Sequence, residues 1–383
     1  MKILNVIENV DEKTGGGAAE RARQISFHLK TLGHNVKLLT TDIHLGRSEN
    51  TSLLNLNLIA LPCINERFYI PWPSLTKINN LVKESEIIQL FSHWTVLNVI
   101  VYLLIRLNKK PYILTSVGAL TIFGRSSSLK KIYNIIFGKR IIRNASKHIL
   151  ATMSELPVLQ SYGVDRIKVA HLPNAINEED YPPKIDNSFK EDLGIGNSPF
   201  ILFVGRLNPI KGPDMLLKAF DLIKEEHPDV NLVFIGPDEG MLDELKTIAR
   251  AKSIIEKVHF LGYLSGSKKV SIIRSSLFLC IPSHREAMSI VVLEAGICSK
   301  PALITNECGF DEVEKIEGGF VVKADIDSIA DGLKKMLSDA NNLNFMGLNL
   351  QKLVQKNYLW SQSSIEHQKL FNEILETQSS SNS

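Results

Sequence analysis

The stretch ILNVIENVDEKTGGGAAERARQISFHLKTLGHNVKLLT, residues 3–40, establishes the architecture of the first half of the chain. Its apolar run at 3–7 predicts a buried strand, and a turn of three glycines at 15–17 separates this strand from a helical pattern at 18–32. A second strand is predicted at 36–40. A strand, a crossover helix and a parallel strand form the unit from which α/β sheets are built.

The same alternation continues along the chain. Further strands of the first half are predicted at 87–91, 112–115, 148–151 and 168–171. A polar segment with prolines and glycines at 177–198 predicts an interdomain linker. The second half repeats the alternation, with strands predicted at 200–204, 231–235, 258–261, 277–281 and 301–305. The sequence therefore predicts an α/β protein of two Rossmann-like, doubly wound domains that face a central cleft.

The length of 383 residues agrees with two domains, because single cores stop growing at roughly 250 to 300 residues. We expect an N-terminal domain at 1–180 and a C-terminal domain at 198–355. A helix at 356–376 is expected to pack back on the N-terminal domain. The Ser-rich end, 377–383, is expected to be disordered.

Composition narrows the partners. Lys and Arg number 44 against 41 for Asp and Glu, so the net charge of +3 gives no reason to expect a nucleic-acid binder. The 4 cysteines are scattered, which is typical of reduced thiols in a cytosolic protein. No signal peptide is expected at the start, and the apolar stretch at 96–107 is shorter than the ~20 residues that span a bilayer. We expect a cytoplasmic location.

Two glutamates carry the most specific chemical signal. In PSHREAMSIVVLEA, residues 282–295, Glu286 follows a predicted strand and Glu294 lies in the next helix. Eight helical residues span about 12 Å, which suits a long ligand held at both ends. The intervening helix N-terminus would face anionic oxygens. The alternative is that Glu286 is a helix-terminal charge and Glu294 a solvated residue.

A second signal follows the first strand of the second half. The loop VGRLNPIKG, residues 204–212, places Arg206 and Lys211 at the carboxyl end of a strand, where such sheets bind ligands. Together they would neutralise a leaving diphosphate without a metal ion. Alone, two cations in a loop are most often solvated surface.

The glycine turn at 15–17 is a third, weaker signal. It lets the backbone approach a ligand at a helix N-terminus. It departs from the dinucleotide fingerprint because position 20 is Glu, although Asp42 stands where a ribose-binding acid would lie. A nicotinamide-dependent oxidoreductase is therefore retained as an alternative. A sugar-binding protein without activity and a sugar-nucleotide epimerase are weaker alternatives.

In this order and spacing, the glycine turn, Arg206, Lys211, Glu286 and Glu294 resemble the retaining glycosyltransferases of family 4, which have the GT-B fold. The likeness runs along nearly the whole chain, and includes the PNA triplet at 173–175 and the strand at 318–322. It implies transfer of a sugar from a nucleotide-diphosphate sugar donor to a saccharide or lipid-linked saccharide acceptor. It also implies that the transfer needs no cofactor or metal ion. The pathway that it implies is the synthesis of bacterial surface polysaccharide.

The resemblance also implies roles for individual residues. Glu286 would contact the donor sugar, Glu294 the ribose hydroxyls, and Arg206 with Lys211 the diphosphate. Further donor contacts would come from the strand end near Leu261 and from two residues of the glycine turn, Gly16 and Gly17. The backbone amides that follow the first glutamate would also bind the donor; they belong to Ala287, Met288, Ser289 and Ile290. Catalysis would rest on Glu286, Arg206 and Lys211.

One departure from the family concerns a histidine. Many relatives have His before Gly in the segment that matches 116–120, where this chain has Val117, so that role is not carried over. His93 is a candidate acceptor-binding residue, although a packed or surface histidine is the more common case.

Two other features allow structural interpretations. Asp325-Ile326-Asp327 matches a metal-binding Asp-x-Asp pair but precedes a predicted helix, where Asp is a good N-cap. The stretch 129–148 mixes basic and apolar residues. Such a stretch could bind peripherally to the anionic inner face of the cell membrane. The alternative is a helix with one core face and one solvated face.

Overall fold

The computed structural model describes residues 1–11, 14–43, 45, 55–72, 74–116, 118–120, 127–183, 198–338 and 340–382. It divides into two compact units. Unit 1 comprises Met1–Asn174 and Trp360–Ser383, and unit 2 comprises Ala175–Leu359. The chain thus leaves unit 1 once and returns to it with its last helix.

Unit 1 is built on a parallel sheet of 7 strands in the order β3-β2-β1-β6-β7-β8-β9. These strands are β1 (Lys2–Val6), β2 (Asn35–Thr41), β3 (Leu58–Leu61), β6 (Ile87–Phe91), β7 (Tyr112–Thr115), β8 (Lys147–Leu150) and β9 (Val169–His171). A short antiparallel pair, β4 (Cys63–Asn65) and β5 (Ile70–Pro71), lies outside it. The central strands read as continuous apolar runs because both faces are covered.

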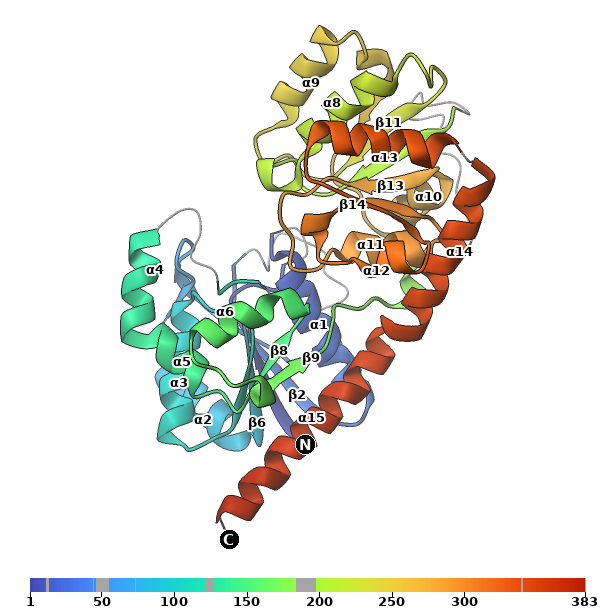
Figure 1. Cartoon of the computed structure of the whole chain (residues 1–383). Helices are drawn as coiled ribbons and strands as arrows, with labels where there is room; N and C mark the ends of the chain where they lie inside the picture. Colours follow the sequence, from blue (N-terminus) through green and yellow to red (C-terminus); the bar gives the residue numbers. More distant parts are fainter. Residues whose placement is uncertain are drawn as a thin grey trace. The chain divides into compact units, whose positions relative to one another are not determined.

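The helices of unit 1 cover this sheet (Figure 1). They are α1 (Gly16–Thr31), α2 (Leu75–Glu84), α3 (Val96–Leu107), α4 (Ser127–Tyr133), α5 (Lys139–Arg143), α6 (Leu156–Ser161) and α15 (Trp360–Asn382), with a π-helical turn at Asn134–Gly138 between α4 and α5. The apolar stretch at 96–107 is α3, whose inner face is buried.

Unit 2 repeats the pattern with a parallel sheet of 6 strands in the order β12-β11-β10-β13-β14-β15. Its strands are β10 (Phe200–Val204), β11 (Asn231–Ile235), β12 (Val258–Phe260), β13 (Phe278–Ile281), β14 (Ala302–Thr305) and β15 (Gly319–Val322). Its helices are α8 (Pro213–Ile223), α9 (Leu242–Ala251), α10 (Gly266–Ser275), α11 (Ile290–Ile297), α12 (Glu312–Lys315), α13 (Ile326–Ser338) and α14 (Ala340–Asn357). In both sheets the strand order reverses beside the first strand, which places a switch point there.

The C-terminal end differs from the expectation of a disordered tail at 377–383. Helix α15 continues through Asn382, and the hydroxyl of Ser379 donates to the Leu375 carbonyl at 3.0 Å. The helix is anchored upstream by the buried side chains of Trp360 and Phe371. Extending an existing helix needs no new nucleation, so a polar end can remain helical.

Candidate functional site

The loops that follow β10, β11 and β13 meet at the carboxyl edge of the second sheet. Gly236 has φ +148°, and a Cβ on it would lie 1.8 Å from the Gly205 carbonyl oxygen. Gly212 has φ +64°, and a Cβ there would lie 2.3 Å from the Pro282 carbonyl oxygen. Only glycine allows approaches this close. They bring the 205–212 loop against the segment that begins at residue 282.

Lys211 and Glu286, which come from two of these loops, form an ion pair. The Lys211 Nζ lies 2.8 Å from the Glu286 Oε1, and their side chains are 22% and 9% exposed. The Ser283 hydroxyl donates to the same carboxylate at 2.6 Å. The Glu286 N–H donates to the Glu307 carbonyl at 2.8 Å, which fixes the main chain. The structure therefore brings together two of the residues that the sequence singled out.

The position of Lys211 follows from a short turn. Asn208 caps the 3-10 turn Pro209–Lys211, and its side-chain oxygen accepts the Lys211 N–H at 3.0 Å. The Asn208 amide also donates to Glu239 at 2.7 Å. The sequence did not predict the roles of Asn208, which caps the turn, or of Ser283, whose hydroxyl binds Glu286. Neither kind of contact has a characteristic spacing along the chain.

Arg206 is engaged elsewhere on the same edge. Its guanidinium contacts the Glu239 carboxylate at 2.9 Å, and the two side chains are 49% and 40% exposed. A solvent-exposed pair of this kind contributes about 0–1 kcal/mol, so Arg206 can turn toward another anion at small cost.

Helix α11 begins close to Glu286. The helix starts at Ile290, so residues 286–289 are not helical and the 12 Å spacing predicted for the glutamates does not apply. Ala287 and Met288 lie in the connecting loop, and Ser289 is the N-cap residue, with its N–H donating to the Cys308 carbonyl at 3.3 Å. The first N–H groups of a helix have no carbonyl partner within it, and they favour an anion.

A buried thiol lies beneath this edge. The Cys308 Sγ donates to the Ile281 carbonyl at 3.3 Å. Burial, with a smaller contribution from the Glu286 carboxylate, raises the pKa of Cys308 to about 12. The thiol therefore stays protonated at neutral pH and is not a nucleophile.

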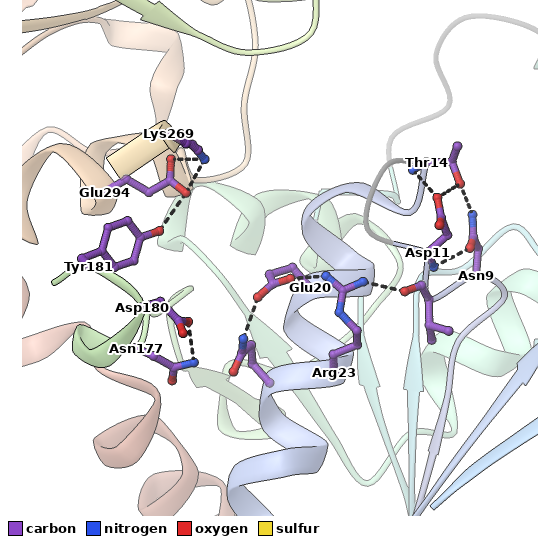
Figure 2. Close-up of polar contacts among 12 residues, drawn as sticks. Asn9, Asp11, Thr14, Glu20, Arg23, Asn177, Asp180, Tyr181, Lys269 and Glu294 are labelled. Carbon is purple, nitrogen blue, oxygen red and sulfur yellow. Dashed lines mark hydrogen bonds and ion pairs between the residues drawn. The ribbon is translucent and has the colours of Figure 1, made fainter. Parts of the chain in front are cut away.

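Glu294 lies further along α11 and is held by two residues that sequence reasoning missed (Figure 2). Its Oε1 accepts hydrogen bonds from the Tyr181 hydroxyl at 2.9 Å and from the Lys269 Nζ at 2.7 Å, and the ammonium also lies 2.7 Å from Oε2. Arg274 in turn donates to the Tyr181 carbonyl at 2.7 Å. Glu294 is only 7% exposed, so it is not the solvated residue of the alternative interpretation.

Leu261 follows β12 at the same carboxyl edge. Its N–H donates to the Phe234 carbonyl at 2.9 Å, and the next residue, Gly262, accepts the Gly236 N–H at 2.8 Å. Leu261 is half-buried. The edge thus gathers Leu261, Lys211 and Glu286 on loops that are tied to one another by main-chain hydrogen bonds.

In unit 1, a polar network shapes the turn before α1 (Figure 2). The Asp11 carboxylate accepts from both the N–H and the hydroxyl of Thr14 at 2.9 Å, and the Asn9 amide donates to that hydroxyl at 2.9 Å. Helix α1 begins at Gly16 rather than at the predicted residue 18, and Gly16 and Gly17 are exposed. The network leaves their backbone at the surface at the start of the helix.

His93 is packed inside unit 1. Its side chain is 0% exposed, and its ring meets those of Trp94 and Tyr133 edge-on, with centroids 4.6 and 5.4 Å apart. Burial lowers the pKa of His93 to about 3, so the imidazole is neutral. This environment favours the packing alternative over the predicted acceptor contact. Val117, where relatives have a histidine, lies outside the described residues.

Other sequence features have structural roles. The Asp325 carboxylate accepts the Ser328 N–H at 2.8 Å, as an N-cap does. The Asp42 carboxylate accepts the Cys63 N–H at 2.9 Å. Within the described ranges, no group of three or more His, Cys, Asp or Glu side chains is arranged to hold a metal ion. No helix in the described part of the chain is long and apolar enough to cross a membrane.

Two families match consecutive parts of the chain. Residues 15–180 match Glycosyltransferase Family 4, and residues 185–352 match Glycosyl transferases group 1. An uncharacterized glycosyltransferase of Methanocaldococcus jannaschii is 31% identical over 203 residues, which cover 51% of each chain. D-inositol 3-phosphate glycosyltransferase of Nocardia farcinica is 27% identical over 220 residues, 55% of this chain and 49% of that protein. The chain thus spans about half the length of the curated relatives it matches.

Solved structures share the fold over nearly the whole chain. HepE of Anabaena in complex with UDP and glucose has a TM-score of 0.78 at 17% identity, covering 97% of this chain and all of that one. Sucrose-phosphate synthase of Thermosynechococcus elongatus has a TM-score of 0.79 at 17% identity, with 98% of this chain covered.

The two parallel sheets and these matches define the GT-B class of α/β proteins. The chain belongs to glycosyltransferase family 4. The family assignment gives no support to the nicotinamide oxidoreductase alternative.

Proposed function

We propose that the protein is a retaining glycosyltransferase that moves a sugar from a nucleoside-diphosphate sugar to a hydroxyl of a glycan or lipid-linked saccharide. The observation that carries this proposal is the Lys211–Glu286 ion pair beside the start of α11. A cation, a carboxylate and a helix N-terminus then share one sheet edge, and this suits a ligand with a diphosphate next to a polyol. The HepE structures with UDP and with UDP-glucose support this donor class.

The donor would be divided among these groups. Lys211 and Arg206 would bind the diphosphate, with the N–H groups of residues 287, 288 and 290 as further donors, whereas the Ser289 N–H already donates to the Cys308 carbonyl. Glu286 would accept hydrogen bonds from the donor sugar, and Glu294 from the ribose. Leu261 would contact the base. The phosphate contacts of Gly16 and Gly17, whose backbone is exposed at the start of α1 in unit 1, stay a prediction from the sequence.

The proposed reaction needs charge stabilisation more than a strong base. The bond between the anomeric carbon and the diphosphate oxygen breaks, and the acceptor oxygen bonds to the same face of that carbon, which retains its configuration. The acceptor proton passes to the leaving diphosphate. Lys211 and Arg206 would offset the negative charge that develops on the leaving group, without a metal ion.

We also propose that the acceptor belongs to bacterial surface polysaccharide synthesis and that unit 1 contacts an anionic membrane at its cytoplasmic face. Along 129–143, Leu129, Ile132, Ile135 and Ile136 are 51%, 52%, 72% and 46% exposed. Exposed Lys131 lies among them, and exposed Lys and Arg residues follow at 139, 140 and 143. Exposed apolar side chains with cations nearby in the sequence suit insertion among anionic headgroups. WaaG, a structural neighbour with a TM-score of 0.69, is involved in lipopolysaccharide biosynthesis.

Two substitutions test the proposed site. Glu286→Gln and Lys211→Ala are expected to reduce transfer by about 100-fold or more, because each removes a charge that the transition state needs. A thermal-shift panel of nucleotide diphosphates and their sugars identifies the donor, and initial rates with that donor measure the loss. Glu307→Gln, an exposed glutamate nearby, is the control. Wild-type rates in either site variant would refute the assigned role.

A further inference from the structure

A glutamate that the proposed mechanism does not use lies at the carboxyl edge of the first sheet. Glu8 follows β1 by two residues, where sheets of this class bind ligands. Its main-chain oxygen accepts hydrogen bonds from the Thr41 hydroxyl at 2.6 Å and the Thr41 N–H at 3.4 Å, which fixes the residue to the last residue of β2. The main chain of Glu8 is therefore held at the end of β2.

The carboxyl group of Glu8 is left incompletely bonded. Its Oε2 is buried and has no hydrogen-bond partner among the described residues. Burial raises the pKa of Glu8 to about 7, and hydrogen bonds with its own main chain and with the Ser92 side chain only partly offset this. No basic residue is among the groups that shift it. A buried acceptor without a donor is costly to the fold, which suggests that a ligand supplies the donor.

The neighbours of Glu8 have unusual backbone conformations. Ser92 directly follows β6, the strand next to β1, and has φ +62°, and Tyr69 has φ +50°. Non-glycine residues in this region are strained, and such strain gathers at binding sites. The Ser92 main chain is held there, since its N–H donates to the Thr115 carbonyl at 3.1 Å.

Two tyrosines complete the surroundings. Burial raises the pKa of Tyr69, and the Glu8 charge raises it further; the same two causes act on Tyr133. The Tyr133 hydroxyl is used internally, because it donates to the His93 carbonyl at 2.5 Å. Glu8, Ser92, Tyr69 and Tyr133 are each partly exposed, so the cluster lies at the surface, although the Glu8 Oε2 itself is covered.

We propose that Glu8 and Ser92 bind a neutral hydroxyl of the acceptor sugar, which donates its hydrogen bond to the Glu8 Oε2. A sugar hydroxyl supplies the donor that Oε2 lacks and also bonds with the Ser92 hydroxyl. Tyrosine rings offer an apolar surface to the carbon face of a sugar ring. A phosphate would be repelled by the carboxylate, and so the acceptor group bound here carries no charge. This inference rests on the proposed function and adds an acceptor contact to it.

The test compares acceptor and donor kinetics of the full chain. The donor is the nucleotide sugar with the largest thermal shift, and the acceptors are a panel of neutral p-nitrophenyl glycosides. Glu8→Ala is expected to raise the acceptor KM about tenfold or more, because a hydrogen bond to a charged group is lost. The donor KM and the slow hydrolysis of donor by water should stay within about twofold. Glu8→Gln should remove the ionisation near neutral pH from the profile of kcat/KM for the acceptor.

A matched control is Glu366→Gln, a surface glutamate of unit 1 that pairs with Lys369 and should leave every constant unchanged. An unchanged acceptor KM in Glu8→Ala, or equal changes in the acceptor and donor KM, would overturn the inference. Failure of the wild type to bind or hydrolyse any nucleotide sugar would remove the proposed function itself. A rise in the acceptor KM of Glu8→Ala, with the donor KM unchanged, would support Glu8 as an acceptor-binding residue.

Discussion

Replacing Glu8 by Gln should stabilise unit 1 at high pH and have little effect at low pH. Burial raises the pKa of Glu8 from 4.5 to about 7 in the folded protein. Between these values the folded state holds more protons on this group than the unfolded state, and so the free energy of unfolding falls as the pH rises through the window. Gln does not titrate and lacks this dependence.

The magnitude follows from the two pKa values. At ~1.4 kcal/mol for each tenfold change in proton affinity, the full effect is about 3 kcal/mol, of which about 2.5 kcal/mol falls between pH ~5 and pH ~8. Solvent reaches part of Glu8 and screens its charge, which reduces the expected difference to about 1–2.5 kcal/mol.

Tryptophan fluorescence is a suitable assay. The chain has 3 tryptophans, Trp72, Trp94 and Trp360, and all of them belong to unit 1, so their emission reports the unfolding of the unit that contains Glu8. Urea titrations of the wild type and Glu8→Gln at pH ~5 and ~8 give the difference at each pH. A difference that is independent of pH, or a wild type that gains on the variant as the pH rises, would refute the assignment of a buried carboxyl group with a raised pKa.

Two further predictions concern other parts of the chain. Lys269→Met should weaken binding of the donor's nucleoside diphosphate about tenfold, because Glu294 loses the ammonium group, 2.7 Å away, that orients it. Calorimetry measures the affinity, and Lys268→Met is the control. Equal affinities of the wild type and Lys269→Met would show that Lys269 does not position Glu294. Ile135→Ser with Ile136→Ser should reduce sedimentation with phosphatidylglycerol vesicles about tenfold or more while rates on a soluble acceptor are kept, since ~0.8 kcal/mol is lost for each CH₂ that leaves the bilayer and two such groups already correspond to about tenfold. Unchanged sedimentation would place the membrane contact elsewhere.

The alternation of strands and helices could be predicted well from the sequence. The strands at 87–91, 112–115, 200–204 and 231–235 begin and end as predicted, because each is an apolar run bounded by polar or turn residues. Strand β3 was missed, since an edge strand of 4 residues that is half-buried has no distinctive pattern. The helical separation of about 12 Å expected between Glu286 and Glu294 was wrong, because residues 286–289 precede α11 and Glu286 is held by polar contacts of its own.

The sequence alone determined the chemistry available at the second sheet, since strand ends and glycine turns are local signals and parallel strands bring their carboxyl ends to one edge. Only the tertiary structure decided which charges meet. Lys211 pairs with Glu286, whereas Arg206 pairs with Glu239 and Glu294 with Lys269, and each of these partners comes from a different loop or helix. Burial was likewise beyond the sequence: Glu8 and His93 owe their pKa values to groups packed around them from distant segments, and no pattern of neighbours along the chain records that packing.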